Sequence, residues 1–258
     1  MQKVALITGA SGGIGEHFAR IHAAKGGDLV LIARSEGKLN TLAEELQQQH
    51  NVQVEVLVKD LSQPQEVQAS YDYLKKQNIE VEYLINNAGF GTYGSFTQTS
   101  WTAEAGMIDL NVRSLTHFCK LWAPEMAQRG YGKILNIAST ASYQPGPFMA
   151  VYFATKHYVL AFSDALAEEL KGTGVTVTTL CPGPTASGFQ EEANMQNAKM
   201  VKGKKMPSSE AVAQYGYQKM QAGKRVVIHG TANRLIAIFA KMMPTPVASA
   251  ITRKVTEA

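Results

Sequence analysis

The sequence predicts an α/β fold, a single domain built around a doubly wound, mostly parallel sheet of seven strands. Three observations support this prediction. Apolar runs of strand length alternate with longer amphipathic stretches along the chain. A glycine-rich turn follows the first apolar run. No internal repeat, low-complexity segment or linker interrupts the 258 residues, so we expect one domain over residues 1–258, with right-handed crossovers between its strands.

The composition is that of an ordinary globular protein and points away from several classes of partner. Hydrophobic residues make up 45% of the chain and charged residues 18%. The formal net charge of +4 is small, so we expect no nucleic-acid partner. Cys119 and Cys181 lack metal-ligand spacing and the six histidines show no pairing, so we expect no metal. Reduced cysteines, no signal-peptide pattern before the first strand and no bilayer-spanning apolar run together suggest a cytoplasmic location.

The first strand is expected at residues 4–7, and residues 8–15 form a glycine-rich turn that leads into a helix. Gly9, Gly13 and Gly15 allow the backbone to approach a pyrophosphate, while the helix N-terminus supplies free N–H groups and a partial positive charge. The spacing differs from G-x-G-x-x-G, and glycine turns also join strands to helices for steric reasons alone. The turn by itself does not separate these two interpretations.

The next three strands are predicted at residues 29–33, 52–58 and 81–85, each an apolar or β-branched run closed by polar or turn-forming residues. Between them, residues 36–49 and 64–77 are predicted to form helices, the second opened by a proline. This part of the chain therefore repeats the strand–helix alternation twice and ends on a strand.

Residues 90–100 are predicted as a loop, and residues 101–129 as one long helix with Asn111 near its middle. The fifth strand is expected at residues 133–138, followed by a helix over residues 150–171. The helix after the fifth strand carries the residues with the clearest chemistry.

The sixth strand, residues 175–180, ends in a Cys-Pro-Gly-Pro turn, after which the pattern loosens. We expect residues 185–222 to form a substrate lid, made of a loose segment followed by a helix over residues 208–222. The seventh strand is predicted at residues 225–229, and residues 230–258 as a C-terminal helical extension.

Tyr152 and Lys156 stand four residues apart, so on a helix they share one face. A neighbouring ammonium favours the phenolate and lowers the pKa of a tyrosine toward the working range. Ser139 precedes Tyr152 by thirteen residues, at a strand end where open α/β sheets bind their ligands. The Tyr-x-x-x-Lys pattern also begins at Tyr71 and Tyr215, but without a serine thirteen residues earlier, so we interpret those two as surface helix pairs. The trio predicts a proton-transfer site.

In their order along the chain, these motifs resemble those of the short-chain dehydrogenase/reductase family from residue 3 to about residue 190. The matching motifs are Thr8-Gly-x-x-x-Gly-x-Gly15, Asn86-Asn-Ala-Gly89, Asn111, Ser139, Tyr152, Lys156 and Pro182-Gly183. The resemblance implies a Rossmann-like seven-stranded sheet that binds a nicotinamide cofactor. Residues 89–94 and the turn at residues 181–184 resemble a bacterial branch of general reductases whose substrates are mostly unassigned.

The resemblance implies four catalytic residues. Tyr152 would exchange a proton with the substrate oxygen, and Lys156 would bind the nicotinamide ribose and lower the pKa of Tyr152. Ser139 would hydrogen-bond the carbonyl being reduced, and Asn111 would hold a water of the proton relay. The structural alternatives are that Asn111 bends its helix and that Ser139 caps its strand end.

The resemblance also implies a cofactor-binding set that follows the ends of the strands. Its members are Gly9, Ser11, Gly13, Ile14, Gly15, Arg34, Asp60, Leu61, Asn87, Ala88, Gly89, Tyr152, Lys156, Pro182, Gly183 and Ser187. Asp60 would contact the adenine. Ser187 departs from the family, which usually has threonine there, but it keeps the hydroxyl that could meet the carboxamide.

The end of the second strand favours NADP(H). An acidic residue at this place selects NAD by binding both ribose hydroxyls, whereas an arginine can bind a 2′-phosphate. Here the acid position is Ala33, and Arg34 and Ser35 follow it. Glu36 falls in the first turn of the next helix, where its interaction with the helix N-terminus is a sufficient role. We therefore expect NADPH, with Arg34 as a solvated loop charge as the alternative.

The expected function is that of an NADP(H)-dependent carbonyl reductase or alcohol dehydrogenase acting on a small molecule. One alternative is a 3-oxoacyl thioester reductase, because Lys202, Lys204 and Lys205 could meet a phosphorylated carrier. A second alternative is a non-catalytic NADP-binding regulatory protein. The sequence identifies neither the substrate nor the preferred direction of reaction.

The helices expected at residues 101–129 and 150–171 carry apolar residues on more than one face, which suggests a homo-oligomer. The family commonly pairs these two helices, which implies a homodimer or a homotetramer. The apolar run at residues 235–240 can join that interface, cover the substrate or touch a membrane surface, and its charge pattern does not choose among the three.

Overall fold

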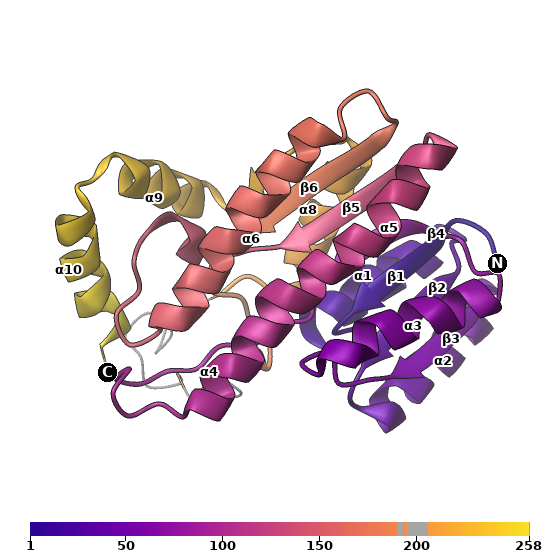
Figure 1. Cartoon of the computed structure of the whole chain (residues 1–258), viewed down its shortest axis with the longest axis horizontal. Helices are drawn as coiled ribbons and strands as arrows, with labels where there is room; N and C mark the ends of the chain where they lie inside the picture. The colour runs from indigo at the N-terminus through magenta and orange to yellow at the C-terminus, as the bar shows by residue number, and fades with distance from the viewer. Residues whose placement is uncertain (190–192, 194, 196–205, 258) are drawn as a thin grey trace.

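Seven parallel strands form one sheet in the order β3-β2-β1-β4-β5-β6-β7 (Figure 1). The computed structural model describes residues 1–189, 193, 195 and 206–257. The strands are β1 Val4–Thr8, β2 Leu29–Ala33, β3 Val54–Val58, β4 Val81–Asn86, β5 Gly132–Ile137, β6 Val175–Cys181 and β7 Val226–Ile228. The predicted doubly wound parallel sheet is confirmed. Its strand order reverses at β1 and β4, where such sheets form a ligand crevice.

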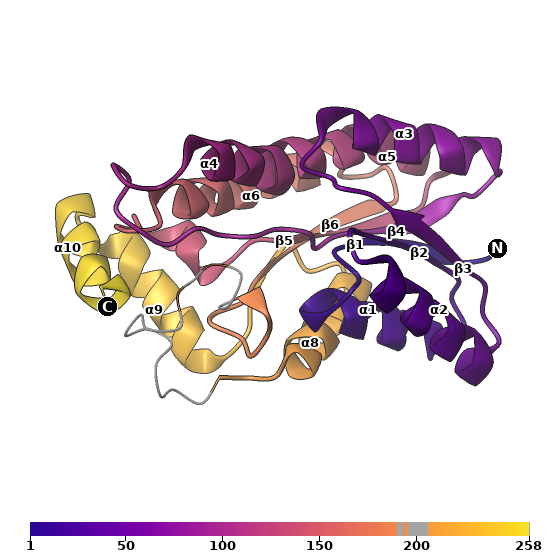
Figure 2. The same ribbon diagram turned by 90° about the horizontal axis from the view of Figure 1, so that it is seen from below.

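Helices cover both faces of the sheet (Figure 2). One face carries α3 (Pro64–Lys76), α4 (Trp101–Ile108), α5 (Leu115–Arg129) and α6 (Ala150–Glu169). The other face carries α1 (Gly13–Ala23), α2 (Glu36–His50) and α8 (Ser209–Gln221). A short 3₁₀ turn, Thr140–Tyr143, lies between β5 and α6 and was not predicted. Because helices bury both faces of the sheet, the side chains on both faces of the strands are mostly apolar, and the strands are nearly continuous apolar runs.

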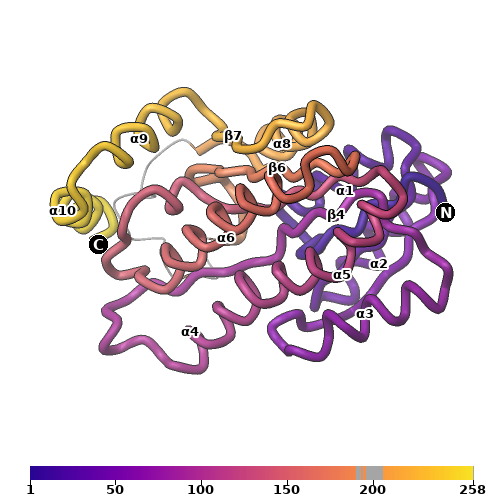
Figure 3. Tube along the Cα trace, turned by 45° about the horizontal axis from the view of Figure 1, so that its top comes forward, coloured from indigo at the N-terminus to yellow at the C-terminus, as the bar shows by residue number. Residues whose placement is uncertain are grey.

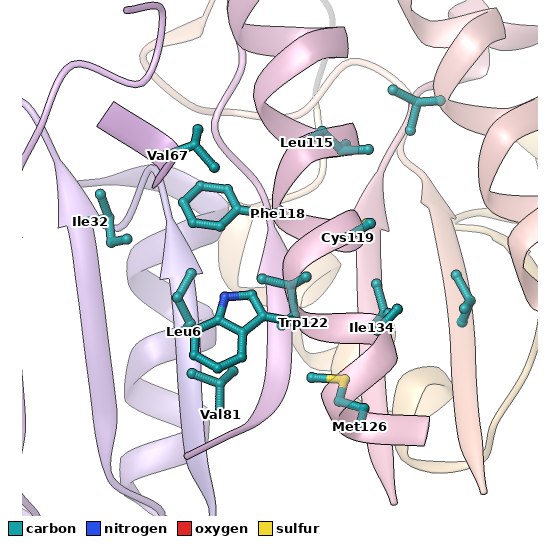
Figure 4. Packing of buried hydrophobic residues seen from close by; sticks show 14 of the residues in the cluster. Leu6, Ile32, Val67, Val81, Leu115, Phe118, Cys119, Trp122, Met126 and Ile134 are labelled. Atoms are coloured by element: carbon teal, nitrogen blue, oxygen red, sulfur yellow. The ribbon is translucent and has the colours of Figure 1, made fainter. Parts of the chain in front are cut away.

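A separate hydrophobic core lies on each face. The first is centred on the fully buried Trp122 and Phe118 of α5. Figure 4 shows the Trp122 indole beside Leu6 and Val81 of neighbouring strands. The second core includes Phe18 of α1, together with apolar residues of α2 and α8. Each such large side chain stabilises the fold by about 1.5–3 kcal/mol.

The predicted single helix over residues 101–129 contains an irregularity. α4 runs into a π-helical turn, Asp109–Ser114, which continues into α5. A π turn inserts an extra residue into the helical register and often marks a functional site. Asn111 lies in this turn and is 1% exposed. The sequence pattern could not show the turn, because one inserted residue hardly alters an apolar periodicity over 29 residues.

The helix that we predicted within the lid has a buried apolar face. α8 starts at a cap in which Ser208 Oγ accepts a hydrogen bond from the Ala211 N–H at 3.2 Å. Four of its apolar side chains are buried: Val212, Ala213, Tyr217 and Met220. This apolar face belongs to the second core, and the lid assignment of residues 185–222 stays a prediction. Of the remaining lid residues, 190–192, 194 and 196–205 lie outside the described part of the chain.

The C-terminal extension consists of α9 (Thr231–Met242) and α10 (Thr245–Thr256), which lie at one end of the molecule, beyond the sheet. The N-terminus lies at the opposite end (Figure 3). Within the described residues, every helix is too short or too polar to cross a bilayer.

Candidate active site

The carboxyl ends of the strands open into a cavity of about 730 Å³. Its walls come from the segments that follow β1 to β6, which is where open α/β sheets bind ligands. The sheet order sets the segments after β2 and β3 on one side of β1 and those after β5 and β6 on the other. The cavity therefore has a β2–β3 side and a β5–β6 side, which we call the nucleotide side and the substrate side.

The glycine turn between the two sides is held by Thr8 and Asn87. Thr8 Oγ1 accepts hydrogen bonds from the backbone N–H groups of Asn87 (3.0 Å) and Ala88 (2.9 Å). The Asn87 side-chain amide donates to the carbonyls of Thr8 (3.0 Å) and Gly9 (3.2 Å). These bonds join the ends of β1 and β4 directly. Thr8 was not among the predicted site residues, although it opens the glycine motif.

At two positions of the turn only glycine fits, because neighbouring atoms lie too close for a Cβ. A Cβ on Gly9 would lie 2.9 Å from the Ala88 Cα, and the Gly9 φ of +66° is a conformation that favours glycine. A Cβ on Gly15 would lie 2.2 Å from the Gly9 carbonyl oxygen. Gly15 does not line the cavity; it allows α1 to start against the turn. The cradle leaves backbone N–H groups open to a phosphate at a helix N-terminus, so these residues fit a dinucleotide.

Tyr152, Lys156 and Ser139 meet on the substrate side, where all three line the cavity. Lys156 is 5% exposed. Its Nζ donates to the Ile137 carbonyl at 2.9 Å and lies 5.8 Å from the centre of the Tyr152 ring. Ser139 Oγ accepts a hydrogen bond from the Ala141 N–H at 3.1 Å and caps the 3₁₀ turn after β5. The three predicted residues thus come together from β5 and α6.

Burial favours the neutral forms of Tyr152 and Lys156 and therefore shifts both pKa values. Burial raises the pKa of Tyr152 to about 12, and a hydrogen bond with Ser139 opposes the rise. Burial lowers the pKa of Lys156 to about 8, and the negative charge that Cys181 can carry opposes this shift. Lys156 is not among the groups that shift the pKa of Tyr152 in this arrangement. That effect therefore stays a prediction for the cofactor complex.

Asn111 clamps the loop after β4 from behind the cavity. Its Oδ1 accepts a hydrogen bond from the Phe90 N–H at 3.1 Å, and its Nδ2 donates to the Phe90 carbonyl at 2.9 Å and to Thr155 Oγ1 at 3.2 Å. A Cβ on Gly89 would lie 2.9 Å from Asn111 Oδ1 and 3.5 Å from Lys156 Nζ. Asn111 does not line the cavity. Gly89 lies between the Asn111 side chain and the Lys156 ammonium and is close to both.

The other predicted cofactor residues all line the cavity. They are Gly9, Ser11, Gly13, Ile14, Arg34, Asp60, Leu61, Asn87, Ala88, Gly89, Pro182, Gly183 and Ser187. Asp60 Oδ1 accepts hydrogen bonds from the N–H and the hydroxyl of Ser62, which fixes the turn after β3. A Cβ on Gly13 would lie 3.5 Å from Ser187 Cβ, so the segment after β6 approaches the glycine turn.

Several lining residues were missed by sequence reasoning. Lys38 and Lys59 join Arg34 on the nucleotide side; a cation four residues after Arg34 was a signal that could have found Lys38. The substrate side is of mixed character, with Thr140, Gln144 and Thr185 in its wall, and it includes a group of apolar residues near Tyr152. The members of this group are Phe90, Met149, Phe153, Phe189 and Met195. The Phe189 ring lies 5.3 Å from the Tyr152 ring, centre to centre. These residues come from separate segments, so no local spacing identifies them.

The other two Tyr-x-x-x-Lys pairs lie away from the cavity. The Tyr71 hydroxyl donates to Glu125, whose second oxygen pairs with Lys75 Nζ at 2.9 Å. Lys219 Nζ lies 5.3 Å from the centre of the Tyr215 ring. The first pair therefore packs against α5, where the Tyr71 ring also lies 4.9 Å from the Trp122 ring, centre to centre, and the second pair makes a contact within α8.

Comparisons with known proteins agree with this geometry. A family model described as short chain dehydrogenase matches residues 3–198. A very-long-chain 3-oxoacyl-CoA reductase of Mus musculus is 30% identical over 254 residues, which cover 93% of this chain and 76% of that protein. A short-chain dehydrogenase from Sphingobium yanoikuyae in complex with NADPH is 32% identical, with a TM-score of 0.83 and 93% of each chain covered. A short chain dehydrogenase/reductase from Burkholderia phymatum in complex with NAD is 27% identical, with a TM-score of 0.84 and 92% of each chain covered.

Proposed function

The chain belongs to the short-chain dehydrogenase/reductase family of oxidoreductases, and from this premise we propose that it is an NADPH-dependent carbonyl reductase with Tyr152 as its acid/base group. One observation carries the proposal. A single cavity joins a glycine cradle to Ser139, Tyr152 and Lys156. This arrangement puts a nucleotide site and a proton donor in one continuous space.

Reduction of a carbonyl needs a hydride at carbon and a proton at oxygen. The bound nicotinamide supplies the hydride. The Tyr152 hydroxyl gives its proton to the carbonyl oxygen as the alcohol forms. Ser139 Oγ donates a hydrogen bond to the same oxygen in place of the Pro182 carbonyl, which it reaches only at 3.5 Å. The Lys156 ammonium stabilises the phenolate that remains.

The preference for NADPH rests on the nucleotide side of the cavity. Arg34, Lys38 and Lys59 line it, and Ala33 stands where a carboxylate would select NAD. Arg34 and Lys38 follow β2 directly and both line the cavity, so we assign the 2′-phosphate to these two residues. The relatives with known structures include both an NADPH complex and an NAD complex. The preference for NADPH is therefore proposed from the basic residues of this chain alone.

The substrate side supports a carbonyl compound with apolar substituents. The described wall next to Tyr152 includes Met149, Phe153 and Phe189, which belong to or pack against one small hydrophobic cluster. An apolar pocket of this kind gains affinity in proportion to the apolar area that the substrate buries. Bulky ketones and aldehydes are therefore the substrate class that we propose, with the corresponding alcohols in the reverse direction.

A 3-oxoacyl thioester reductase is the second candidate, favoured by the identity to the very-long-chain 3-oxoacyl-CoA reductase over 93% of this chain. Lys202, Lys204 and Lys205, which we considered for a phosphorylated carrier, lie outside the described residues. An apolar acyl chain would suit the same wall as a bulky ketone. The two candidates differ in whether the thioester group is required for turnover.

A spectrophotometric screen tests the proposal. NADPH oxidation is followed with aryl and alkyl ketones, aldehydes, steroids and 3-oxoacyl thioesters at equal concentrations. We expect turnover with bulky apolar ketones or aldehydes, and turnover restricted to the thioesters favours the second candidate. Tight NADPH binding with no turnover on any compound would instead revive the non-catalytic regulatory protein.

We also propose a homodimer or homotetramer formed through the α4–α5 segment and α6. The support is apolar surface on these helices that their own sheet does not cover. Ile108 and Tyr158 are each 39% exposed, and the Tyr158 and Phe162 rings stack with their centres 5.8 Å apart. Association through these helices would bury this surface.

A further inference from the structure

Two helices at the C-terminal end of the chain expose their large apolar residues. In α9, the face that packs on the domain consists of small residues, with Ala237 2% and Ala240 8% exposed. The large apolar side chains of α9 point outward and are 47–78% exposed. They are Leu235, Ile236, Ile238, Phe239 and Met242. Four of these follow the i, i+3, i+4, i+7 spacing of a single helix face, so α9 presents a continuous apolar face to solvent.

α10 repeats this arrangement. Its inward residues are Ala248, Thr252 and Thr256, each at most 5% exposed. Val247, Ile251 and Val255 form an exposed stripe with i, i+4 spacing and are 41–48% exposed. Core helices bury their largest apolar residues, and these two helices bury their smallest. We call the exposed apolar residues of α9 and α10 the C-terminal face.

The charged residues within α9 and α10 are all basic. Arg234, Lys241, Arg253 and Lys254 are the charged residues of the two helices, and no acidic residue occurs between Gly230 and Thr256. These four cations equal the formal net charge of the chain, because its remaining 21 basic residues are balanced by 21 acidic ones. Glu257, which directly follows α10, is exposed as well, so residues 230–257 carry a net charge of +3, four basic residues minus one acidic residue.

The helix pair is fixed to the domain next to the substrate side. Thr256 Oγ1 donates to the Pro147 carbonyl at 3.0 Å, and the Arg253 guanidinium lies 5.6 Å from the centre of the Phe148 ring. Lys241 Nζ lies 5.1 Å from the centre of the Tyr143 ring. The exposed face is therefore presented by a fixed scaffold.

We propose that the C-terminal face docks on the surface of a lipid bilayer that contains anionic headgroups. An amphipathic helix with aliphatic and aromatic residues on one face and cations beside it binds at such an interface through apolar burial and charge attraction. A second copy of the chain would bring the same cations together across the contact, whereas anionic lipid complements them. The proposal does not depend on the proposed activity, since binding is measured without turnover.

Vesicle co-sedimentation of the full chain tests the proposal. The vesicles are pure phosphatidylcholine or phosphatidylcholine with phosphatidylglycerol, at low and physiological salt. We expect at least about tenfold tighter binding to the anionic vesicles, weakened by salt. The double variant Phe239→Ser/Met242→Ser, at positions 62% and 78% exposed, should lose at least about tenfold in affinity. The double variant Arg234→Gln/Lys254→Gln should lose the preference for anionic lipid.

Matched controls keep the test specific. Phe96→Ser removes an aromatic side chain that is 66% exposed and lies outside the two helices. Lys25→Gln removes an exposed cation in the turn between α1 and β2. Both should bind like the parent, and NADPH binding by every variant reports that the domain is folded. Absence of parent binding to anionic vesicles overturns the proposal. The proposal is also overturned if the parent forms an oligomer, the Phe239→Ser/Met242→Ser variant is a monomer, and the variant binds vesicles as tightly as the parent.

Discussion

At the scale of the residue, the chemistry depends on one phenol. Tyr152→Phe keeps the ring that contacts Phe189 and removes the proposed acid. Turnover should fall by at least about a hundredfold, the scale of general acid catalysis, while NADPH affinity changes little. Steady-state kinetics and a cofactor titration measure the two effects. Tyr71→Phe and Tyr215→Phe are the controls and should keep parental turnover; loss of activity in either one, with activity retained in Tyr152→Phe, means that the wrong tyrosine was chosen.

The buried amine of Lys156 predicts a pH dependence of stability. Its pKa is lowered by burial from 10.5 to about 8 in the folded chain. Between these two values the unfolded chain binds more protons, so the lysine's contribution to the free energy of unfolding increases with pH. The gain is about 2–3 kcal/mol from about pH 7.5 to about pH 10.

The lysine's contribution is isolated by comparison with Lys156→Met, which has no amine to titrate. Urea unfolding of both proteins gives the difference in free energy of unfolding at each pH. We expect the parent to gain stability relative to Lys156→Met as the pH rises. A difference that stays constant over this window would show that the amine is not buried in the way described.

Cofactor choice is also decided by single residues. An Arg to phosphate hydrogen bond contributes about 1.5–3 kcal/mol, so NADPH should be preferred over NADH by roughly ten- to a hundredfold. Arg34→Ala and Lys38→Ala should each reduce this preference, measured as the ratio of kcat/KM values. Lys120→Ala removes an exposed cation that does not line the cavity and is the control. Equal kcat/KM values for the two cofactors in the parent refute the assignment.

At the scale of the element, the start of α1 depends on the absence of a single side chain. Gly15→Ala puts a methyl group 2.2 Å from the Gly9 carbonyl and 2.5 Å from the Asn87 amide nitrogen. Gly9 lies in the glycine turn between β1 and α1, and Asn87 lies in the segment after β4 that is hydrogen-bonded to this turn. The free energy of unfolding should fall by about 1–3 kcal/mol, and cofactor affinity should fall with it because the cradle shifts.

Gly37→Ala is the matched control for that substitution. Gly37 lies in α2, and nothing is within 4 Å of a Cβ built there. The alanine should keep or raise stability, by up to about 1 kcal/mol, because glycine is a poor helix former. Thermal and urea unfolding of the two variants decide the matter, and equal effects would argue against the close approach at Gly15.

The π turn Asp109–Ser114 is the second feature at this scale. It directs Asn111 inward, where both amide atoms bind the Phe90 backbone. A regular helix would rotate this position relative to the loop after β4. The irregularity therefore links the long helix to the wall of the site, a role that the sequence suggested only as a bend.

At the scale of the whole molecule, the surface of α4, α5 and α6 predicts association. Light scattering at micromolar concentration should give the mass of a dimer or a tetramer. Tyr158→Lys, at a position 39% exposed, should shift the equilibrium toward the monomer by placing like charges across the contact. Tyr73→Lys, at a position of α3 that is also 39% exposed and lies outside these helices, is the control. A parental mass of one chain contradicts the proposal.

The sequence by itself determined the sheet, the glycine turn and the face shared by Tyr152 and Lys156. Each depends on spacings of a few residues: runs of strand length, glycines two to four residues apart, and one helical turn. Such spacings hold wherever the segment lies in the fold. The family's motifs added their order along the chain, which is also readable without a structure.

The tertiary structure alone decided which distant segments meet. It buried Lys156 against the Ile137 carbonyl, brought Lys59 to the side of Arg34 and packed the apolar face of α8 into the second core. It also turned the small face of α9 inward and left the large apolar residues of the run at residues 235–240 exposed. Local periodicity states that a helix has an apolar face, but which face is buried depends on packing against residues far away in the chain.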